Sequence, residues 1–573
     1  MKTMMTGRWV ARTVFAVLSA VRFVAAEPAG NPLDKPNLIF ILTDDQRYDT
    51  LGCTGNPIVK TPNIDRMAAE GTLFTEATVG SAICTPSRAS IFTGMYERRH
   101  GINFNSGTAM SPADWQRTYP MLLRRAGYCI GYIGKNHVPV GAKGYSTGLM
   151  DADFDYWYAG HTHIYFYPKD RPGRVLRVKG IDEHMFDNAK ADTQIEIIQE
   201  GIENFLQPND AFYHAAARFL EKRPADRPFC LSVCFNLPHD AGTGSMEDRS
   251  SDPELYKTGY HDQRDAIRAA LPETYIARED IKKPKLPADV HYAGCRQDSY
   301  NYVDNPDSLT ERIIRRYQAI TGIDNLIGRL RGQLHELGLA DNTVIVLASD
   351  HGIFRGEFGL GGKSMNYDVC LKVPMIIYDP ASSAKGQKRR EQVQTVDIAA
   401  TLLDYAGAEI PEFMSGKSMR PLVRGEQVPW RTYAFSENLW STQFGNPRIE
   451  SVRGNGWKYI RYFSNDRSLF DPDLEGMARY LTSNRQAETY RQWLDASING
   501  EPPVYEELYR LEQDPHEINN LADDSRYSEK LNEMRAVCRR RVVEARGGAD
   551  VQPTVFQLES ERLEYYLNHQ KHD

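Results

Sequence analysis

Cysteine is scarce in this chain, which has eight among 573 residues. The spacing of these cysteines matches neither a zinc-binding pattern nor the dense pattern of a disulfide-stabilised domain. We therefore expect a fold that ordinary hydrophobic cores hold together.

Long apolar runs and a strong charge excess are also missing. After the first 26 residues no apolar run approaches the length of a membrane span, so we expect no membrane-spanning segment. The chain has 69 basic and 76 acidic side chains and a formal charge of −7. This small excess does not indicate nucleic acid or another polyanion as a partner, and any anion site has to be local.

The first 26 residues have the pattern of a signal peptide. Lys2, Arg8 and Arg12 precede an apolar run at residues 14–21, and small residues follow at 24–26. An amphipathic N-terminal tail is the alternative. The signal-peptide interpretation predicts a mature protein that is secreted or periplasmic.

Four apolar segments contain runs of strand length with little alternation of apolar and polar residues. Such runs are typical of strands that are buried on both faces of a parallel sheet. A helical spacing of apolar residues at 309–337 predicts a long helix before the fourth segment. We therefore predict an α/β domain at residues 35–428, with a large mixed, mostly parallel sheet between layers of helices. The four segments are residues 35–42, 124–137, 227–237 and 341–348.

The composition changes at about residue 430. Short segments at 432–435, 451–453 and 457–463 favour antiparallel strands, and a final helix is expected after them. Because 573 residues exceed the usual size of one hydrophobic core, at least two domains are expected. We predict a smaller α+β subdomain with an antiparallel sheet at residues 429–573.

Acidic residues follow two of the predicted strands. Asp44 and Asp45 come directly after the first, and Asp350 and His351 follow the fourth. The carboxyl ends of parallel strands meet at one edge of a sheet, where open α/β sheets bind their ligands. Two unpaired carboxylates there repel each other unless a cation lies between them. An acidic turn is the alternative for an Asp-Asp pair taken by itself.

Basic residues follow the other two predicted strands. Lys135 and His137 come after the second, and because they are two positions apart on an extended segment, their side chains can point to the same side. His239 follows the third strand. A surface position is the alternative for a Lys-x-His pair. At the strand ends these residues would join Asp44 at the same edge of the sheet.

Cys84 begins a segment with the features of a helix N-terminus. Pro86 is tolerated in a first helical turn, and apolar residues continue at Ile91 and Phe92. The free N–H groups there suit a bound anion, and Arg88, one turn further, adds donors for a tetrahedral oxyanion. A buried structural cysteine is the alternative.

The sequence Cys84-Thr-Pro-Ser-Arg88, followed by Ala-Ser-Ile-Phe-Thr-Gly94, resembles the signature of the type I sulfatases in the alkaline-phosphatase-like superfamily. The resemblance covers roughly residues 35–540. It implies an alkaline-phosphatase-like fold and a sulfuric ester hydrolase that removes sulfate from an organic sulfate ester. It also implies that a formylglycine-generating or an anaerobic maturation enzyme oxidises Cys84 to formylglycine (3-oxoalanine).

The same resemblance implies one divalent cation per chain, expected to be Ca²⁺. Calcium takes oxygen donors, so imidazole is an unusual ligand, and family members carry either Asn or His at the position of His351. The cation would bind the formylglycine hydrate and one sulfate oxygen, and would lower the pKa of the attacking hydroxyl. The implied metal ligands are Asp44, Asp45, Cys84, Asp350 and His351.

Further residues are implied to act on the sulfate and on the departing alcohol. Arg88, Lys135 and Lys363 would neutralise the sulfate oxygens. His239 would be the general acid toward the leaving alcohol, and His137 would act on the second hydroxyl of the hydrate, because a near-neutral pKa suits both tasks.

A sulfated carbohydrate is the expected substrate, with another sulfate ester as the broader alternative. Sugar recognition needs donors and stacking faces outside the sulfate pocket, and residues 161–167 form a suitable aromatic and polar cluster. Ordinary loop packing is the alternative for that cluster, and a solvated helix end is the alternative for residues 98–100. The residues expected to line the approach to Cys84 are Arg98, His100, His161 and His163.

Two other function classes stay open. A phosphoryl hydrolase of the same superfamily would normally have Ser or Thr as its nucleophile and two zinc ions with more His ligands, which the Cys-x-Pro-x-Arg sequence disfavours. A non-catalytic binder of sulfated glycans would result if Cys84 were never oxidised.

Overall fold

The computed structural model describes residues 35–103, 108–141, 149–160, 176–179, 211–239, 254–287, 290, 298–439, 447–464, 484–554 and 556–557. The expected signal peptide at residues 1–26 lies outside this part. Within the described residues, no helix combines the length and the apolar character that crossing a membrane requires.

A large sheet forms the centre of the molecule. Its strands are β1 (Asn37–Thr43), β2 (Thr72–Phe74), β4 (Cys129–Lys135), β5 (Tyr156–Gly160), β6 (Leu176–Lys179), β7 (Phe229–Cys234), β8 (Thr343–Ser349), β11 (Met375–Tyr378) and β12 (Gln387–Arg389). In the described part of the chain their order is β12-β2-β11-β8-β1-β7-β4-β5-β6. The central strands β8, β1, β7 and β4 are parallel, whereas β11 and β6 are antiparallel to their neighbours. The prediction of a mixed, mostly parallel sheet is confirmed.

The register brings the carboxyl ends of the four central strands to one edge. Thr43 of β1 lies beside Ser349 of β8. Leu42 lies beside Cys234 of β7, which in turn lies beside Gly134 of β4. The polar residues that follow these strands therefore emerge side by side.

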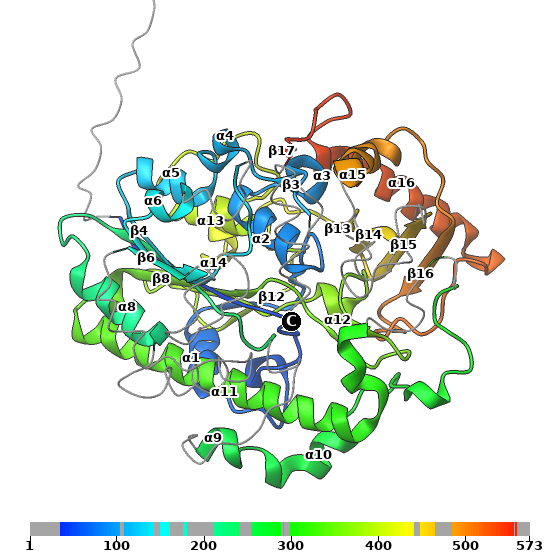
Figure 1. Cartoon of the computed structure of the whole chain (residues 1–573), viewed down its shortest axis with the longest axis horizontal. Coiled ribbons are helices and arrows are strands. Elements are labelled where there is room, and N and C mark those ends of the chain that lie inside the picture. The colour runs from blue at the N-terminus through cyan, green and yellow to red at the C-terminus, as the bar shows by residue number, and fades with distance from the viewer. Residues whose placement is uncertain are drawn as a thin grey trace, which may run out of the picture.

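Helices cover both faces of this sheet, as Figure 1 shows. The layers are α1 (Pro62–Glu70), α8 (Ala211–Lys222) and α11 (Pro306–Glu336) on one face, and α2 (Cys84–Thr93), α5 (Tyr119–Arg125) and α13 (Asp397–Tyr405) on the other. Ile39 and Ile41 of β1 pack into the first layer, and Leu38 and Phe40 into the second. Alternate residues of β1 thus enter different cores, which explains why its sequence is apolar throughout.

Short elements connect these layers. They are α3 (Glu97–His100), α4 (Pro112–Trp115), α6 (Leu149–Asp153), α9 (Glu254–Lys257), α10 (Arg264–Ala269), the 3-10 helix η8 (Asp298–Asp304), α12 (Asp368–Leu371), α14 (Arg420–Val423) and the strand pairs β3 (Thr108–Ala109) with β17 (Phe556–Gln557) and β9 (Phe354–Arg355) with β10 (Gly361–Gly362).

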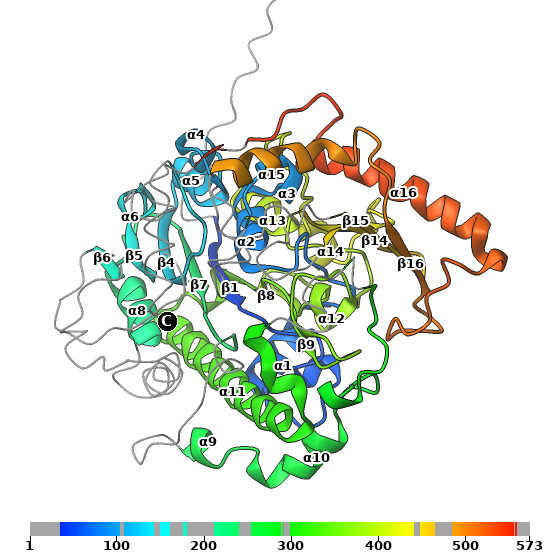
Figure 2. The ribbon, with the colours of Figure 1, turned by 45° about the vertical axis from the view of Figure 1, so that its right-hand side comes forward.

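A second, antiparallel sheet follows near the C-terminal end, together with two helices. Its elements are β13 (Ala434–Asn438), β14 (Arg448–Gly454), β15 (Trp457–Phe463), β16 (Tyr505–Arg510), α15 (Asn484–Ala496) and α16 (Ser528–Arg546). Figure 2 shows α16 lying along the outside of this sheet, where Met534 packs with Val452 and Leu508. Ile460 and Tyr509 belong to a core on the side of the large sheet.

The second sheet confirms the predicted antiparallel character of this region, while the exact domain boundary near residue 429 stays a prediction. One strand of this sheet was not among the segments expected from the sequence. Residues 505–510 form the strand β16, which pairs with β15 from Tyr505 to Arg510. That pairing partner is more than 40 residues away in the sequence, and local patterning does not reveal it.

Candidate active site

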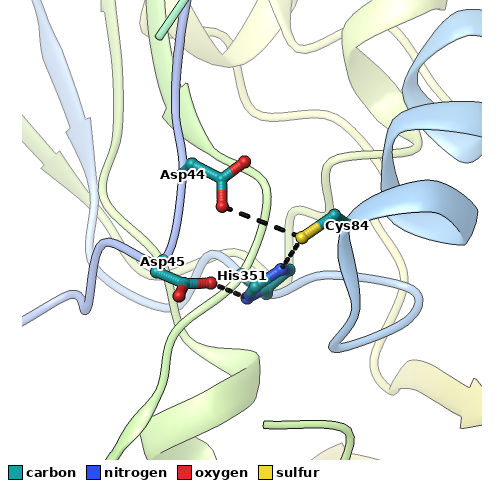
Figure 3. Close-up of side chains that lie close together, drawn as sticks. All are labelled: Asp44, Asp45, Cys84 and His351. Carbon is teal, nitrogen blue, oxygen red and sulfur yellow. Dashed lines mark hydrogen bonds and ion pairs between the residues drawn. The ribbon is translucent and has the colours of Figure 1, made fainter. Parts of the chain in front are cut away.

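Three segments that are distant in the sequence meet at the carboxyl edge of the large sheet. Asp44 and Asp45 follow β1, His351 follows β8, and Cys84 begins α2. One ligand atom from each of these four residues lies within 4.8 Å of every other. Figure 3 shows the two carboxylates, the thiol and the imidazole ring turned toward one another. The predicted convergence of strand-end residues with Cys84 is therefore present in the structure.

The Cys84 thiol is the centre of this arrangement. It is 1% exposed and belongs to the first turn of α2, as its sequence predicts. Its Sγ lies 3.2 Å from Nζ of Lys363, 3.2 Å from Nε2 of His351 and 3.7 Å from Oδ1 of Asp44.

Asp45 has an unusual backbone and an unsatisfied oxygen. Its φ of 58° lies in the left-handed region, which costs a non-glycine residue free energy. The N–H of Asp45 donates to Oδ1 of Asp350 at 3.2 Å, and Oδ1 of Asp45 accepts from Lys363 at 2.9 Å. Oδ2 is buried and accepts no hydrogen bond from the described residues. A buried carboxylate oxygen in that state suits a hard cation, so the side chains present fit a metal ion with oxygen ligands.

Arg88 connects the two strand ends. Its Nε donates to Oδ2 of Asp350 at 2.9 Å, Nη2 donates to Oδ2 of Asp44 at 2.7 Å, and Nη1 donates to the carbonyl of Lys135 at 2.7 Å. Burial alone would lower the pKa of Arg88, but Asp350 and Asp44 raise the pKa well above its usual value. Arg88 is thus a fixed cation that orients the carboxylates of β1 and β8. Because Nε, Nη1 and Nη2 all have partners within the protein, the expectation that Arg88 binds the sulfate oxygens is replaced by this orienting role.

Two lysines add positive charge to the same edge. Nζ of Lys135 forms an ion pair with Oδ2 of Asp44 at 2.6 Å, and both side chains are fully buried. Burial would raise the pKa of Asp44, but Lys135 and Arg88 hold that pKa well below its usual value. Lys363 is 3% exposed and bridges Asp45 and Cys84. Lys363 therefore places a positive charge next to Cys84, and Lys135 places one next to Asp44.

Three histidines also lie at the carboxyl edge of the large sheet. His351 lies between Cys84 and Asp45, with Nδ1 3.2 Å from Oδ1 of Asp45. Burial lowers its pKa, but Asp350 and Cys84 outweigh burial and raise the pKa to about 9. His239 follows β7, is 7% exposed, and places Nε2 3.8 Å from Oδ2 of Asp45. His137 follows β4 and is buried in a left-handed conformation with φ of 58°.

Arg98 lies in a different environment from the one that the sequence predicts. Its side chain is fully buried and forms ion pairs with Glu437 at 2.7 Å and with Glu450 at 2.6 Å. Its Nη1 is 3.3 Å from both the Leu494 carbonyl and Ser497 Oγ. Because these contacts use the guanidinium donors, the prediction that Arg98 lines the approach to Cys84 has to be corrected. Arg98 joins α3 to the antiparallel sheet.

His100 is likewise part of the interior. It is 1% exposed, its Nδ1 accepts from the N–H of Ile102 at 3.0 Å, and its Nε2 lies 3.1 Å from Oγ of Ser90 on α2. Burial lowers the pKa of His100 to about 3, so this imidazole is neutral near pH 7. The expected substrate contact of His100 is corrected to a packing contact with the helix that carries Cys84. His161 and His163 lie outside the described residues.

Sequence reasoning missed two residues that hold the strand ends. Ser87 donates from Oγ to the carbonyl of Asp350 at 2.6 Å. Arg316 of α11 donates from Nη1 to the carbonyl of Asp45 at 3.1 Å. The position of Arg316 among the apolar residues of the predicted helix indicated that its side chain points inward, but nothing in the sequence indicated its contact with Asp45, which lies 271 positions away.

Comparison with known proteins gives the family. The family model of sulfatases matches residues 36–408. The chain belongs to the sulfatase family. A second model, for the C-terminal part of N-sulphoglucosamine sulphohydrolase, matches residues 356–492 of this sulfatase. The resemblance of the Cys84 segment is thereby confirmed, and this sulfatase is a sulfuric ester hydrolase.

Individual relatives span nearly the whole chain. This sulfatase is 27% identical to an arylsulfatase of Clostridium perfringens, over 88% of this chain and 93% of the relative. It is 25% identical to an N-acetylglucosamine-6-O-sulfatase of Bacteroides thetaiotaomicron, over 91% and 89%. A protein solved in complex with its substrate D-glucosamine-2-N,6-O-disulfate has a TM-score of 0.60 at 22% identity, over 90% and 99%. These matches confirm the alkaline-phosphatase-like fold class.

The same fold also carries a neighbouring chemistry. A phosphonate monoester hydrolase of Agrobacterium radiobacter has a TM-score of 0.56 at 21% identity, over 89% of this chain and 96% of that one. The fold alone therefore does not separate sulfur from phosphorus esters, and the side chains around Cys84 have to carry that distinction.

Proposed function

We propose that this sulfatase removes sulfate from a sulfated carbohydrate, with formylglycine made from Cys84 as nucleophile and a calcium ion at the strand-end carboxylates. The observation that carries the proposal is the position of Cys84 Sγ, 3.2 Å from Lys363 and within 4.8 Å of carboxylate oxygens of Asp44 and Asp45. The named substrates of two comparison proteins, an N-acetylglucosamine 6-O-sulfate and a glucosamine disulfate, favour an amino sugar.

The metal site would be built from carboxylates of two adjacent strands. Asp44, Asp45 and Asp350 supply oxygen atoms, which calcium prefers and zinc does not require. His351 would either complete the set or orient Asp45, with which it already forms an ion pair. Bound there, the cation would lower the pKa of the attacking hydroxyl of the formylglycine hydrate.

The chain's own cations would hold the sulfate. Lys135 ends β4 and pairs with Asp44, whereas Lys363 follows the β9–β10 hairpin and contacts Cys84 and Asp45; each would exchange its present aspartate contact for a sulfate oxygen. Arg88 would keep Asp44 and Asp350 in place. His239, at the open end of β7, would donate the proton to the leaving alcohol, and His137 would take the proton of the second hydroxyl.

Maturation and export complete the proposal. A formylglycine-generating or anaerobic maturation enzyme would convert Cys84, and the protein would act outside the cytoplasm, as the N-terminal pattern indicates. Mass spectrometry of the tryptic peptide 67–88 tests maturation directly, because the thiol is exchanged for an aldehyde. An unmodified thiol in fully purified native protein would support the non-catalytic glycan binder instead.

Substrate class is tested by a matched screen. We expect faster turnover of sulfated glucosamine oligosaccharides than of an aryl sulfate, and little turnover of a phosphate monoester. Removal of metal by a chelator should abolish turnover, and calcium should restore it better than zinc. Rescue by zinc alone, or preference for the phosphate ester, would favour the phosphoryl hydrolase.

A further inference from the structure

Asp45 needs support that its own sequence does not provide. A left-handed backbone conformation at a residue that is not glycine persists only where surrounding contacts fix it. The direction of the Asp45 carboxylate depends on this conformation, because Cα–Cβ turns with the backbone. Whatever holds the peptide on either side of Asp45 therefore also sets where the carboxylate points.

Two contacts hold Asp45 from opposite sides. On its N-terminal side, the N–H donates to Oδ1 of Asp350. On its C-terminal side, the carbonyl accepts from Nη1 of Arg316 at 3.1 Å. Arg316 is 4% exposed and belongs to α11, the long helix that packs under the sheet. Its Nη2 lies 4.0 Å from Oδ2 of Asp45, too far for a hydrogen bond.

We propose that Arg316 is a positioning residue for the metal site: by binding the carbonyl of Asp45 it holds this residue in the left-handed conformation and aims Oδ2 at the cation. The inference rests on the proposed metal site. It assigns to α11 a part in metal binding that goes beyond covering the sheet.

Positioning of Asp45 by Arg316 can be distinguished from repulsion between the Arg316 guanidinium and the cation. The hydrogen bond of Arg316 goes to the carbonyl, which leaves Oδ2 of Asp45 available to a cation. A guanidinium this close would also repel a divalent ion. If repulsion dominated, removal of Arg316 would tighten calcium binding; if positioning dominates, removal weakens it. The two effects have opposite signs, so one titration decides between them.

The experiment compares two adjacent arginines of α11. Arg315 is also buried, at 5% exposed, but its Nε pairs with Glu311. Calcium titrations by calorimetry on the metal-stripped full-length chain would compare wild type, Arg316→Met and the control Arg315→Met. We expect calcium affinity to fall about 10- to 100-fold in Arg316→Met, the usual effect of losing a residue that orients a metal ligand, and to change little in Arg315→Met.

A conservative variant keeps the test decisive if Arg316→Met folds poorly. Arg316→Lys retains a charged donor and should recover part of the affinity, while melting curves in chelator report the fold of each variant. Unchanged or tighter calcium binding in Arg316→Met, or an equal loss in Arg315→Met, would overturn the proposal. Absence of calcium binding in the wild type would instead remove the proposed metal site itself. Because the readout is binding, neither result depends on turnover.

Discussion

Two buried charge clusters can be compared in this sulfatase. The active-site cluster contains Asp44, Asp45, Cys84, Arg88, Lys135, Asp350, His351 and Lys363 at the edge of the large sheet. The α3 cluster contains Arg98, Glu437, Glu450 and Arg461 between α3 and the antiparallel sheet. Both consist of carboxylates and cations removed from water, and the residue types by themselves do not distinguish them.

The two clusters differ in whether every carboxylate oxygen accepts a hydrogen bond. In the α3 cluster, Oε2 of Glu437 and Oε1 of Glu450 accept from Arg98, and Oε2 of Glu450 accepts from Nε of Arg461 at 2.7 Å. In the active-site cluster, Oδ2 of Asp45 accepts no hydrogen bond from the described residues. A closed network fixes the packing of two parts of a fold, whereas an open carboxylate beside a nucleophile leaves room for a cation and substrate. Four predictions test this distinction.

The largest effect is expected at the nucleophile. Cys84→Ala should lower the turnover of a sulfate ester by on the order of 10⁵-fold, because no other group can form the covalent bond to sulfur. Unfolding by denaturant should remain close to wild type. Cys538→Ala removes another buried thiol, on α16, and is the matched control. Activity retained in Cys84→Ala would exclude the proposed mechanism.

The next prediction concerns replacement of a carboxylate by an amide, made once in each cluster. Asp45→Asn should reduce kcat/KM by more than about 100-fold even with excess calcium, since it removes a proposed metal ligand. Glu450→Gln should leave kcat/KM of the folded enzyme near wild type and lower its stability instead. Kinetics and chemical unfolding of both variants make the comparison, and a loss of activity in Glu450→Gln at full folding would contradict it.

Arg98→Met should act on stability. It leaves Glu437 buried without its cation and Glu450 with Arg461 as its remaining cation, and we expect a cost of about 3 to 5 kcal/mol of unfolding free energy. The Michaelis constant for a sulfated glycan should stay unchanged. An increase in that constant without a loss of stability would restore the original prediction that Arg98 contacts the substrate.

The smallest effect per unit of pH concerns Glu97, which lies beside the α3 cluster. Burial and the neighbouring Glu437 raise the pKa of Glu97 to about 8. Between about pH 4.5 and 8 the folded protein therefore keeps a proton that the unfolded chain releases, so stability falls as the pH rises through this window.

Glu97→Gln cannot titrate and should flatten that fall by up to about 1.4 kcal/mol per pH unit. The Gln carbonyl can still accept from the N–H of Leu439, and the amide group that replaces Oε2 can donate to Oγ of Ser81. Unfolding midpoints across the window measure the effect, with Glu533→Gln on the exposed side of α16 as control. An unchanged slope would show that Glu97 is ionised in the folded protein.

Local sequence was sufficient for the elements that carry the active site. The apolar runs ending at Asp44, Lys135 and Asp350 predicted parallel strands, and Pro86 after Cys84 predicted a helix start. These features depend on neighbours in the sequence, and parallel strands bring their carboxyl ends to one edge whatever the rest of the fold is. The resemblance around Cys84 then implied the reaction, hydrolysis of a sulfate ester.

The sequence did not show which carboxylates Arg88 of α2 and Arg98 of α3 would meet. Arg88 pairs with Asp350, which lies 262 positions away, and also with Asp44. Arg98 pairs with Glu437, which lies 339 positions away, and also with Glu450. The sequence likewise gave no sign that Arg316 would reach Asp45.

The sequence by itself thus determined which polar residues stand at the strand ends, because that depends on short-range patterning. The tertiary structure alone decided which buried carboxylates have all their oxygens hydrogen-bonded and which do not, because the decisive pairs, such as Arg88 with Asp350 and Arg98 with Glu437, join segments hundreds of residues apart and form only when sheets and helices pack.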